Sequence, residues 1–563
     1  MRLYSTLPMS FAALLATSPV TAHPQPDHPS AVQLSIRTSA AGASIAHSPS
    51  FSSFSFEPAF WVDFFGNASS PNALTFRLLD LIHQHGGAPI IRPGGITMDS
   101  MIFNASASPG DSVRDVSTTG GVYRTTVGPA YYESWSNFPN GTKFVSTLNF
   151  GNDSLDIALG LAVASVIYQR ELVEYFELGN EPTNYPSSRW NDSTAAYVAQ
   201  WKNWTAAIDA AVNSTVGASS DAAQLGYGSE RWWASSATTD ITGLKVKPAD
   251  IIPFGIDSMD QVAEYSIHSY PFSTCDPARA ALATIANILN HTYLASYADT
   301  SILPSALAAL DAGSSWTIGE FNSISCSGAP NVSDTFAQAL WVIDSELIYA
   351  VRNASSCHLH QGATLAFQSG DQVNTPGANG TPGFSTYDMV YPETSELRGA
   401  ARVLPSFAGL LFLAEVFATD GTRIVEVGAP EGVDADYFAA YALYEGGGDG
   451  VLSKLAVVNL RPYYANLTTD YTVSIDISAH IMGGALNPKH HGPQPHYGGD
   501  ATATQAYVKR LTAPYVDAKD AADVTWAGQS FANGSAIGQV RKEVVGDDGI
   551  VSVRGSEAVL VFL

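Results

Sequence analysis

The chain has 563 residues, of which 45% are hydrophobic, and a formal net charge of −25 with only 27 lysines and arginines. This length is typical of two domains or of one large barrel with an accessory domain, and the apolar fraction is enough for a large core. The acidic balance argues against binding to nucleic acid or to anionic membranes. It also argues against a groove for a long polyanion. It does not exclude a local basic pocket that binds one acidic sugar.

The first residues predict export from the cell. Arg2 gives a positive start, residues 11–15 are apolar, and Val20-Thr21-Ala22 provides small residues for cleavage. We therefore expect a signal peptide at residues 1–22 and a secreted, extracellular protein. No other segment is long and apolar enough to span a bilayer, so we expect no membrane partner.

Glycosylation sequons support the same expectation. The motif Asn-x-Ser/Thr occurs at Asn67, Asn104, Asn140, Asn152, Asn191, Asn203, Asn213, Asn290, Asn331, Asn353, Asn379, Asn466 and Asn533. So many sequons in one chain predict N-glycans at several of them, with these asparagines on the surface.

From residue 54 onward, short apolar or β-branched runs alternate with helical stretches. Strands are predicted at 54–57, 89–92, 144–149, 173–179, 225–228, 265–268, 316–319 and 362–367, and helices at 73–85, 154–169, 194–212, 276–289, 332–352 and 393–417. About eight consecutive β/α units are the periodicity of a (β/α)8 TIM barrel, which we place at residues 51–420.

The pattern changes beyond residue 422. Strands are predicted at 424–427, 437–444, 454–459, 472–477, 504–508 and 558–563, with glycine-rich turns between them and no convincing helix. This predicts a C-terminal β-sandwich domain made of residues 23–50 plus 421–563, in which a strand from 31–36 closes one sheet. Bracing the barrel is the role we expect for this domain, and binding of glycan stays open.

Barrel enzymes place their catalytic groups at the carboxyl ends of the strands, so acidic residues at these positions are informative. Glu181 ends the fourth predicted strand, just before Pro182, and Glu320 ends the seventh. Cleavage of a glycosidic bond needs an acid to protonate the leaving oxygen and a carboxylate on the other side of the anomeric carbon. The two glutamates therefore indicate a glycoside hydrolase.

Three motifs together resemble glycoside hydrolase family 79, which contains β-glucuronidases and heparanases. They are RPGGITMD at 92–99, GNEP at 179–182 and IGEFNS at 318–323, and the resemblance runs from about residue 54 to the C-terminus. It implies a retaining exo-β-glucuronidase that releases terminal glucuronic acid, with or without a 4-O-methyl group. Glu181 would be the acid/base and Glu320 the nucleophile, with no metal and no organic cofactor.

The resemblance also implies supporting roles. Asn180 would hydrogen-bond the sugar 2-hydroxyl, Tyr270 would donate to the nucleophile, and His268 would orient the same network. Arg92 is expected to tie barrel carboxylates together, and Asp99 to cap the helix that follows it.

The uronate carboxylate needs donors, and few lysines or arginines follow the strand ends. The loop after strand eight is our candidate, with Tyr387 leading and the backbone at Gly383 beside it. Glu57, at the end of strand one, is expected to bind a sugar hydroxyl. The segment Ser325-Cys326-Ser327 departs from the family, which often has an aromatic residue after the nucleophile.

The chain has three cysteines. No Cys-x-x-Cys motif or compact histidine cluster accompanies them, so we expect no metal site. In an oxidising compartment two can pair and one stays free. Cys275 and Cys326 follow neighbouring strand ends at the same barrel mouth, so we expect a disulfide between them and a free Cys357.

Two alternatives remain from the residues. A neutral-sugar hydrolase of the same clan would use the same glutamates without a pocket for a carboxylate. A carbohydrate-binding protein on a catalytically silent barrel would bind sugar without turnover. Heparanase-type endo cleavage of sulfated polymers is disfavoured, because the acidic chain does not predict a basic groove.

Overall fold

The computed structural model describes residues 31–107, 112–116, 122–217, 230–239, 243–363, 383–448, 450–481 and 505–563. The expected signal peptide at 1–22, the predicted strand at 225–228, most of the predicted strand at 362–367 and the rest of the segment up to residue 382 lie outside the described residues.

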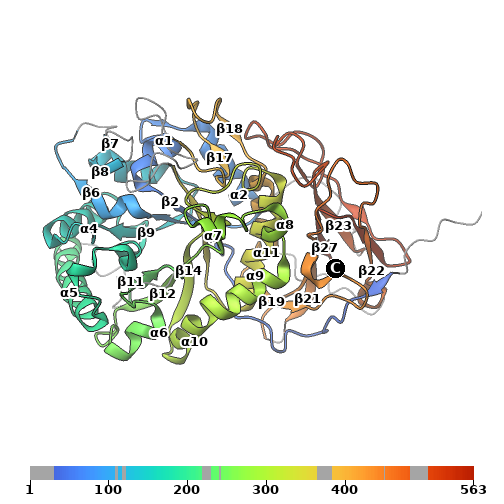
Figure 1. The fold of residues 1–563 in the computed structure, drawn as a ribbon, viewed down its shortest axis with the longest axis horizontal. Helices are drawn as coiled ribbons and strands as arrows, with labels where there is room; N and C mark the ends of the chain where they lie inside the picture. The colour runs from blue at the N-terminus through green and yellow to red at the C-terminus, as the bar shows by residue number, and fades with distance from the viewer. Residues whose placement is uncertain are drawn as a thin grey trace, which may run out of the picture.

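Eight parallel strands form a closed barrel, on the left of Figure 1. In chain order they are β2 (Ser52–Phe56), β5 (Ile90–Pro93), β9 (Lys143–Leu148), β10 (Val173–Leu178), β11 (Trp232–Ala237), β12 (Val262–Ser269), β14 (Ser315–Phe321) and β16 (Cys357–Gln361). Each strand pairs with the next along the chain, and β16 closes the ring on β2. The predicted (β/α)8 barrel is confirmed.

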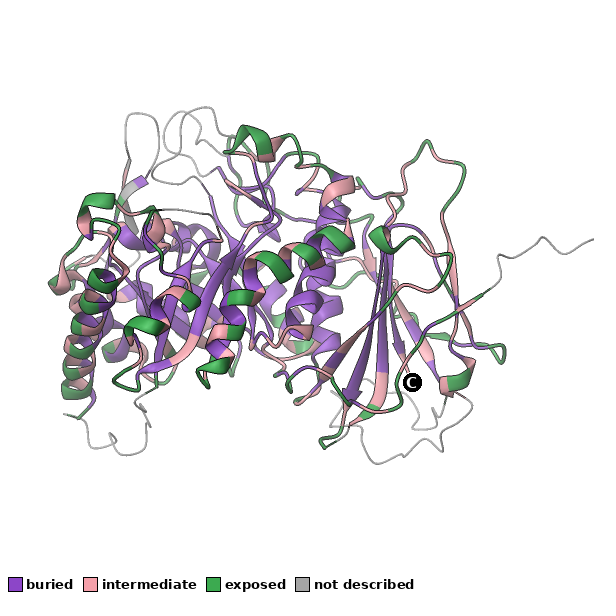
Figure 2. Cartoon of the chain, turned by 60° about the horizontal axis from the view of Figure 1, so that its bottom comes forward, coloured by how far each residue is buried: buried purple, intermediate pink, exposed green. Residues whose placement is uncertain are grey.

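Helices cover the outside of this barrel. The longer ones are α2 (Ala73–His85), α4 (Leu155–Gln169), α5 (Thr194–Gly217), α10 (Leu303–Asp311), α11 (Phe336–Val351) and α12 (Ser406–Val416). Local sequence explains where they start: the Asn72 side chain accepts from the N–H groups of Leu74 and Thr75 and caps α2. The outer helices carry most of the exposed residues of the barrel, whereas the strands are buried (Figure 2).

Two barrel strands differ from the prediction. The fifth strand is β11, and the eighth is β16, which ends before the predicted range of 362–367 begins. Both strands are rich in inward polar residues, such as Ser236 on β11 and His360 on β16. The interior of this barrel is polar near the mouth, so an apolar pattern is a poor guide to these strands.

Two predicted helices are also wrong in extent. The range 276–289 holds only α7 (Pro277–Ala280) and α8 (Ile285–Ile288), because Thr284 caps a new helix in the middle of the range. In the range 393–417, β18 (Arg402–Val403) pairs with β17 (Val390–Tyr391), and α12 starts only after Pro405. Proline disfavours helical backbone in the residue before it, so the helix starts late.

The C-terminal domain contains two sheets, at the right of Figure 1. The larger sheet contains β19 (Arg423–Val427), β20 (Phe438–Glu445), β21 (Val451–Asn459), β27 (Glu557–Phe562), β23 (Tyr507–Thr512), β24 (Thr525–Trp526) and β25 (Glu543–Val544). The smaller sheet contains β1 (Val32–Gln33), β22 (Val473–Asp476) and β26 (Ile550–Val553). The N-terminal strand β1 pairs in parallel with β22, so a segment from each side of the barrel sequence joins in one sheet.

Alternate residues of the larger sheet enter two different cores. On β20, Tyr441 and Leu443 belong to the core shared with the barrel helices, whereas Ala442 and Tyr444 belong to the core between the two sheets. Successive side chains of a strand point to opposite faces. The sheet is therefore buried on both faces and is packed directly on the barrel, next to α11 and α12.

Among the described residues, no helix is both long and apolar enough to cross a membrane.

Candidate active site

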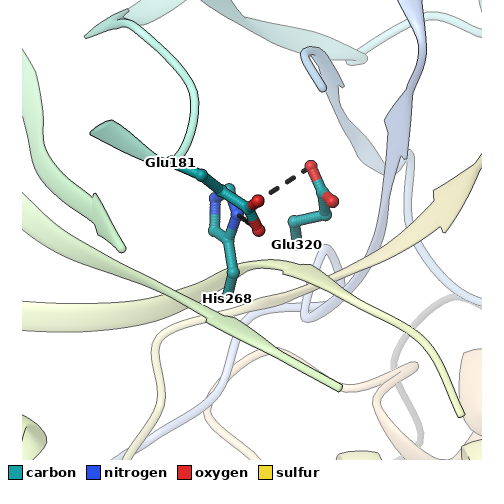
Figure 3. A group of neighbouring side chains, drawn as sticks. All are labelled: Glu181, His268 and Glu320. Carbon is teal, nitrogen blue, oxygen red and sulfur yellow. Dashed lines mark hydrogen bonds and ion pairs between the residues drawn. The ribbon is translucent and has the colours of Figure 1, made fainter. Parts of the chain in front are cut away.

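Two glutamates lie at the carboxyl ends of barrel strands, where they face each other. Glu181 follows β10 and Glu320 is near the end of β14. One carboxylate oxygen of each, together with a ring nitrogen of His268, all lie within 4.8 Å of one another (Figure 3). Retaining glycosidases hold their carboxyl groups about 5–5.5 Å apart, and inverting ones about 6.5–9.5 Å apart. The spacing of the two carboxylates is closer to the range of the retaining enzymes than to that of the inverting ones.

The turn after β10 aims Glu181. Gly179 has a φ of 81°, and a Cβ there would lie 2.5 Å from the Tyr185 hydroxyl, so only glycine fits. Glu181 itself is left-handed, with a φ of 46° and a ψ of 62°, and its N–H donates to the Ser236 carbonyl at 3.0 Å. Non-glycine residues adopt this conformation mostly where the surroundings enforce it, often at functional sites. Pro182 then starts a short 3-10 turn.

Asn180 is held at both its backbone and its side chain. Its N–H donates to Asp99 Oδ2 at 3.2 Å, and its Oδ1 accepts from Arg92 Nη2 at 2.9 Å. These bonds fix the orientation of the amide and leave its Nδ2 group for a substrate hydroxyl. The expected contact with a sugar 2-hydroxyl stays a prediction.

Glu320 accepts from two donors. The Tyr270 hydroxyl donates to Oε1 at 2.9 Å, and Arg92 Nη1 donates to Oε2 at 2.9 Å. Burial alone raises the pKa of Glu320, but nearby His360, His268 and Arg92 and the Tyr270 hydrogen bond outweigh it and lower the pKa to about 2. Burial also lowers the pKa of His360 to about 4, so this ring is neutral above that pH. The permanent charge of Arg92 is then the dependable reason that Glu320 stays ionised.

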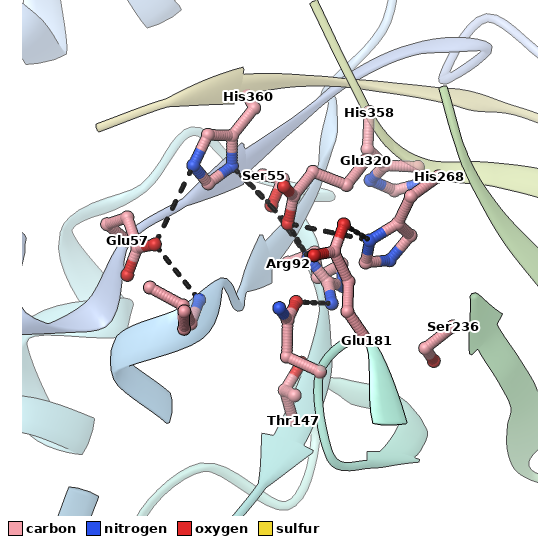
Figure 4. A network of polar contacts seen from close by, with 12 residues as sticks. Ser55, Glu57, Arg92, Thr147, Glu181, Ser236, His268, Glu320, His358 and His360 are labelled. Atoms are coloured by element: carbon pink, nitrogen blue, oxygen red, sulfur yellow. Dashed lines mark hydrogen bonds and ion pairs between the residues drawn. The ribbon is translucent and has the colours of Figure 1, made fainter. Parts of the chain in front are cut away.

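Arg92 is the centre of this polar network (Figure 4). It is fully buried, and besides Glu320 and Asn180 it donates to Ser55 Oγ at 2.9 Å and to Glu177 Oε2 at 2.6 Å. Glu177 is also fully buried and accepts from Thr147 at 2.9 Å and Ser236 at 2.6 Å. Six strands thus contribute to one hydrogen-bonded network, in which Arg92 contacts both Glu177 and Glu320, as a residue that ties carboxylates together would.

His268 lies between the two glutamates. Its Nδ1 is 3.1 Å from Glu181 Oε1 and 4.0 Å from Glu320 Oε2, and the ring is buried. The three side chains are close enough to be considered as metal ligands. However, Glu320 already accepts from a guanidinium and a phenol, and a buried Arg92 would repel a cation there. The donor set fits an acid/base pair better than a metal centre.

Glu57 lies on the other side of Glu320. Its carboxylate accepts from the N–H groups of Ile96 at 3.0 Å and Thr97 at 3.1 Å, and Thr97 Oγ1 also donates to it. Burial raises the pKa of Glu57 to about 8. Its Oε1 is 3.9 Å from His360 Nε2 (Figure 4). Glu57 therefore anchors the turn after β5, and the sugar contact expected from the sequence stays a prediction.

The structure brings Tyr387 to the same region. Its ring is buried and lies 6.3 Å from the His360 ring. Burial raises the pKa of Tyr387, and the charges of Asp388, Glu320 and Glu57 act in the same direction. Tyr387 thus lies on the Glu57 side of the site. Gly383, the first described residue after the gap at 364–382, is also buried. The same loop meets the end of β16, because the Ser385 N–H donates to the Gly362 carbonyl at 2.9 Å.

Asp99 does not cap a following helix, as the sequence suggested. It lies within a 3-10 turn (Ile96–Ser100) and accepts from the Tyr185 hydroxyl at 2.6 Å and from the N–H groups of Phe150, Gly151 and Asn180. No helix starts at these donors, so Asp99 instead ties the loops after β9 and β10 to the β5 loop. Burial raises the pKa of Asp99 to about 7.

Cys275 and Cys326 form a disulfide in the structure, with a Cα–Cα distance of 5.9 Å, and Cys357 is a buried free thiol. Next to the disulfide, β13 (Phe272–Ser273) pairs in parallel with β15 (Ile324–Ser325). The loops that follow Tyr270 and Glu320 are therefore joined by both a ladder and a covalent bond, which limits how far the nucleophile and its hydroxyl donor can separate.

Two site residues were missed at the sequence level. His360 is 3.6 Å from Glu320 Oε2 and belongs to β16, whose range was placed too late in the chain. Its alternation with His358 on one strand was an available signal, because residues two apart share a face. Asn184 donates to Glu181 Oε2 at 2.8 Å, and it follows the GNEP motif with no pattern that marks it.

Comparison with known proteins places these features in a family context. Residues 440–560 match the family described as "Glycosyl hydrolase family 79 C-terminal beta domain". The chain is 29% identical to a protein named "Beta-glucuronidase" from Aspergillus niger, over 97% of both chains. It is 25% identical to a "Beta-glucuronidase" from Neurospora crassa, over 89% of this chain and 87% of the relative.

Among solved structures, the fold is similar to that of a 4-O-α-L-rhamnosyl-β-D-glucuronidase from Fusarium oxysporum 12S, with a TM-score of 0.68. The sequences are 20% identical, and the match covers 95% of this chain and 99% of the other. At this identity the likeness shows the shared architecture of barrel and β-domain.

Proposed function

Because the chain belongs to glycoside hydrolase family 79, we propose that this glycoside hydrolase is a retaining exo-β-glucuronidase. Its substrate would be a glycan or glycoconjugate with a terminal β-glucuronic acid, with or without a 4-O-methyl group. The observation that carries the proposal is the pair of carboxylates in different surroundings. Glu320 is buried and held ionised by Arg92 and Tyr270, whereas Glu181 is partly exposed and lies within 4.8 Å of it.

In the first step the Glu320 carboxylate attacks the anomeric carbon as the bond to the leaving oxygen breaks. Glu181 gives its proton to that oxygen, and the aglycone leaves as an alcohol. The sugar is now an ester of Glu320. The Tyr270 hydroxyl lies 2.9 Å from Oε1 and orients the nucleophile for this attack.

In the second step Glu181, now ionised, takes a proton from water as the water oxygen attacks the anomeric carbon. The ester bond breaks and Glu320 returns as a carboxylate. Arg92 supports this departure, because its Nη1 lies 2.9 Å from Oε2 of the leaving carboxylate. Two inversions give net retention of the β configuration.

Specificity for the uronate is proposed to come from the loop after β16. Tyr387 lies on the side of the site that holds Glu57 and His360, and Gly383 precedes it by four residues in the same loop. A phenol and backbone N–H groups can bind a carboxylate without a lysine or arginine. The names of the two relatives from Aspergillus niger and Neurospora crassa support the choice of glucuronic acid.

The protein is further proposed to be secreted and N-glycosylated. Twelve of the thirteen sequon asparagines are in the described residues, and each of the twelve is exposed or partly exposed. Glycans are added to surface asparagines, so this placement is compatible with their use. The two-faced burial of the larger β-sheet supports a bracing role for the C-terminal domain.

The test compares hydrolysis of a chromogenic β-glucuronide and the matching β-glucoside at mildly acidic pH, with wild type, Glu320→Gln and Tyr387→Phe. We expect turnover of the glucuronide alone, complete loss in Glu320→Gln, and a selective loss on the glucuronide in Tyr387→Phe. A proton NMR time course should show the β anomer of the product first. Turnover of the glucoside instead would refute the uronate specificity, and release of the α anomer first would refute retention.

A further inference from the structure

A second side chain contacts the acid/base directly. Glu181 is followed by a 3-10 turn (Pro182–Asn184) that brings Asn184 back over it. The Asn184 N–H donates to the Glu181 carbonyl at 2.8 Å, and Asn184 Nδ2 donates to Glu181 Oε2 at 2.8 Å. The backbone and the side chain of one residue thus both bond to the same glutamate.

The two oxygens of the Glu181 carboxylate have different surroundings. Oε1 faces His268, which is fully buried, at 3.1 Å. Oε2 faces Asn184, which is exposed. Oε2 is thus the oxygen on the more exposed side of the carboxylate, from which a leaving group and the hydrolytic water can approach. Asn184 therefore contacts the solvent-side oxygen of Glu181.

We propose that Asn184 is a positioning residue that sets the protonation balance of Glu181 between its two roles, an inference that rests on the proposed function. Its Nδ2 donates to the ionised carboxylate, the form that acts as base in the second step. When Glu181 is protonated, a half-turn of the amide presents Oδ1, which accepts from the carboxyl O–H. The same side chain can then hold the Glu181 rotamer in both states, and the donor form favours the ionised one.

The loop itself is held by other residues. The Tyr185 hydroxyl donates to Asp99 at 2.6 Å, and the Arg189 guanidinium stacks on the rings of Phe150 at 4.2 Å and Trp190 at 4.3 Å. The backbone bond from Asn184 to Glu181 does not need the amide side chain. Removal of that side chain should therefore leave the loop in place and delete only the bond to Oε2.

The experiment measures the pH dependence of kcat/KM for Asn184→Ala and Asn184→Asp, with the exposed loop residue Ser188→Ala as a matched control. Loss of a donor disfavours the carboxylate, so the alkaline limb of Asn184→Ala should move up by roughly half to one pH unit. Asn184→Asp should move it further, because a second carboxylate opposes ionisation of Glu181. Ser188→Ala should leave the limb in place.

Leaving groups give a second readout. An activated aryl leaving group departs with little help from an acid, whereas an alkyl group leaves as a strongly basic alkoxide unless it receives the proton. In the first step Asn184→Ala should lose about tenfold more kcat/KM with the poor leaving group than with the activated one if the rotamer of Glu181 is loosened. A residue that only supports the fold would lower both rates equally.

An equal loss at every pH and for every leaving group would overturn the proposal. If the wild type hydrolyses only a neutral glycoside, the proposed specificity for uronates fails but the role of Asn184 is still tested. The same variants are then compared on that glycoside. If no glycoside is hydrolysed, the proposed function fails, and the pH dependence of carbodiimide labelling at Glu181 is compared in wild type and Asn184→Ala. Identical labelling midpoints would then overturn the role of Asn184.

Discussion

Replacement of Arg92 tests the polar network of the site most directly. Arg92→Met keeps much of the side-chain volume but removes the only guanidinium that lies between Glu177 and Glu320 in the described residues. Both carboxylates are buried, so each would lose its cationic partner without gaining water. Breaking a buried ion pair by removal of one partner costs about 3–5 kcal/mol. We expect a loss of that size in the free energy of unfolding at pH 7, measured by urea denaturation.

The pH dependence sharpens this prediction. The pKa of Glu320 is lowered in the folded state to about 2, so its contribution to stability is complete above about pH 4.5 and is lost as the pH falls toward 2. Without Arg92 that contribution shrinks, and the difference in stability between wild type and Arg92→Met should narrow over the same interval. The acidic limb of kcat/KM should move to higher pH, because Glu320 becomes protonated more easily.

Two further variants separate the causes. Arg92→Lys keeps a charge but lacks the planar fork that reaches several acceptors at once, so it should lose less stability than Arg92→Met and still lose activity. Arg92→Met combined with Glu177→Gln should recover part of the stability, because it removes one unpaired charge, but should not restore the acidic limb. Stability within 1 kcal/mol of wild type for Arg92→Met, or an unmoved acidic limb, would refute the reasoning.

Two other predictions concern named hydrogen bonds. Tyr270→Phe removes the hydroxyl that donates to Glu320 Oε1 at 2.9 Å. The acidic limb of kcat/KM should therefore move to higher pH, by less than in Arg92→Met. An unchanged acidic limb in the pH–rate profile would contradict this prediction. At the junction of barrel and β-domain, His291 contacts Asp344 at 3.0 Å and Glu426 at 3.2 Å. Burial alone lowers its pKa, but these carboxylates outweigh burial and raise the pKa to about 10. His291→Gln should therefore lower the unfolding midpoint in denaturant at pH 6, and this effect should shrink as the pH rises from about 6.5 through 10. An equal loss of stability at pH 6 and pH 10 would contradict the prediction.

The sequence predicted the barrel and both glutamates because their signals are local. The GNEP motif forms one turn from its glycine, its left-handed glutamate and its proline, so four consecutive residues are enough to predict it. The strands that were misplaced carry polar side chains into the barrel, as His360 does beside Ser55. Their periodicity resembles that of a loop, because burial in this barrel is achieved by hydrogen bonding as well as by apolar contact.

Contacts that depend on the register between strands distant in the chain could not be predicted from the sequence. His360 is opposite Ser55 in the pairing of β16 with β2, and that register follows from closure of the ring. For the same reason Asp99 was assigned to a cap, although its partners come from loops at 150–151 and 180–185. Residue type and position at a strand end predicted which acidic groups meet at the barrel mouth, but not which neighbours contact them.

The pairing of β1 with β22 has a consequence for biosynthesis. The contact between Gln33 and Asp476 spans 443 residues, and every barrel strand lies between them in the chain. Because consecutive barrel strands are neighbours in space, the barrel can close while later residues are still being added. The smaller sheet must wait for almost the whole polypeptide, so β1 has no partner strand until β22 is made, and β22 in turn has an open edge unless β1 covers it. The N-terminal strand therefore covers the edge of β22 only at the end of synthesis. A C-terminal fragment expressed without this strand should be prone to aggregation.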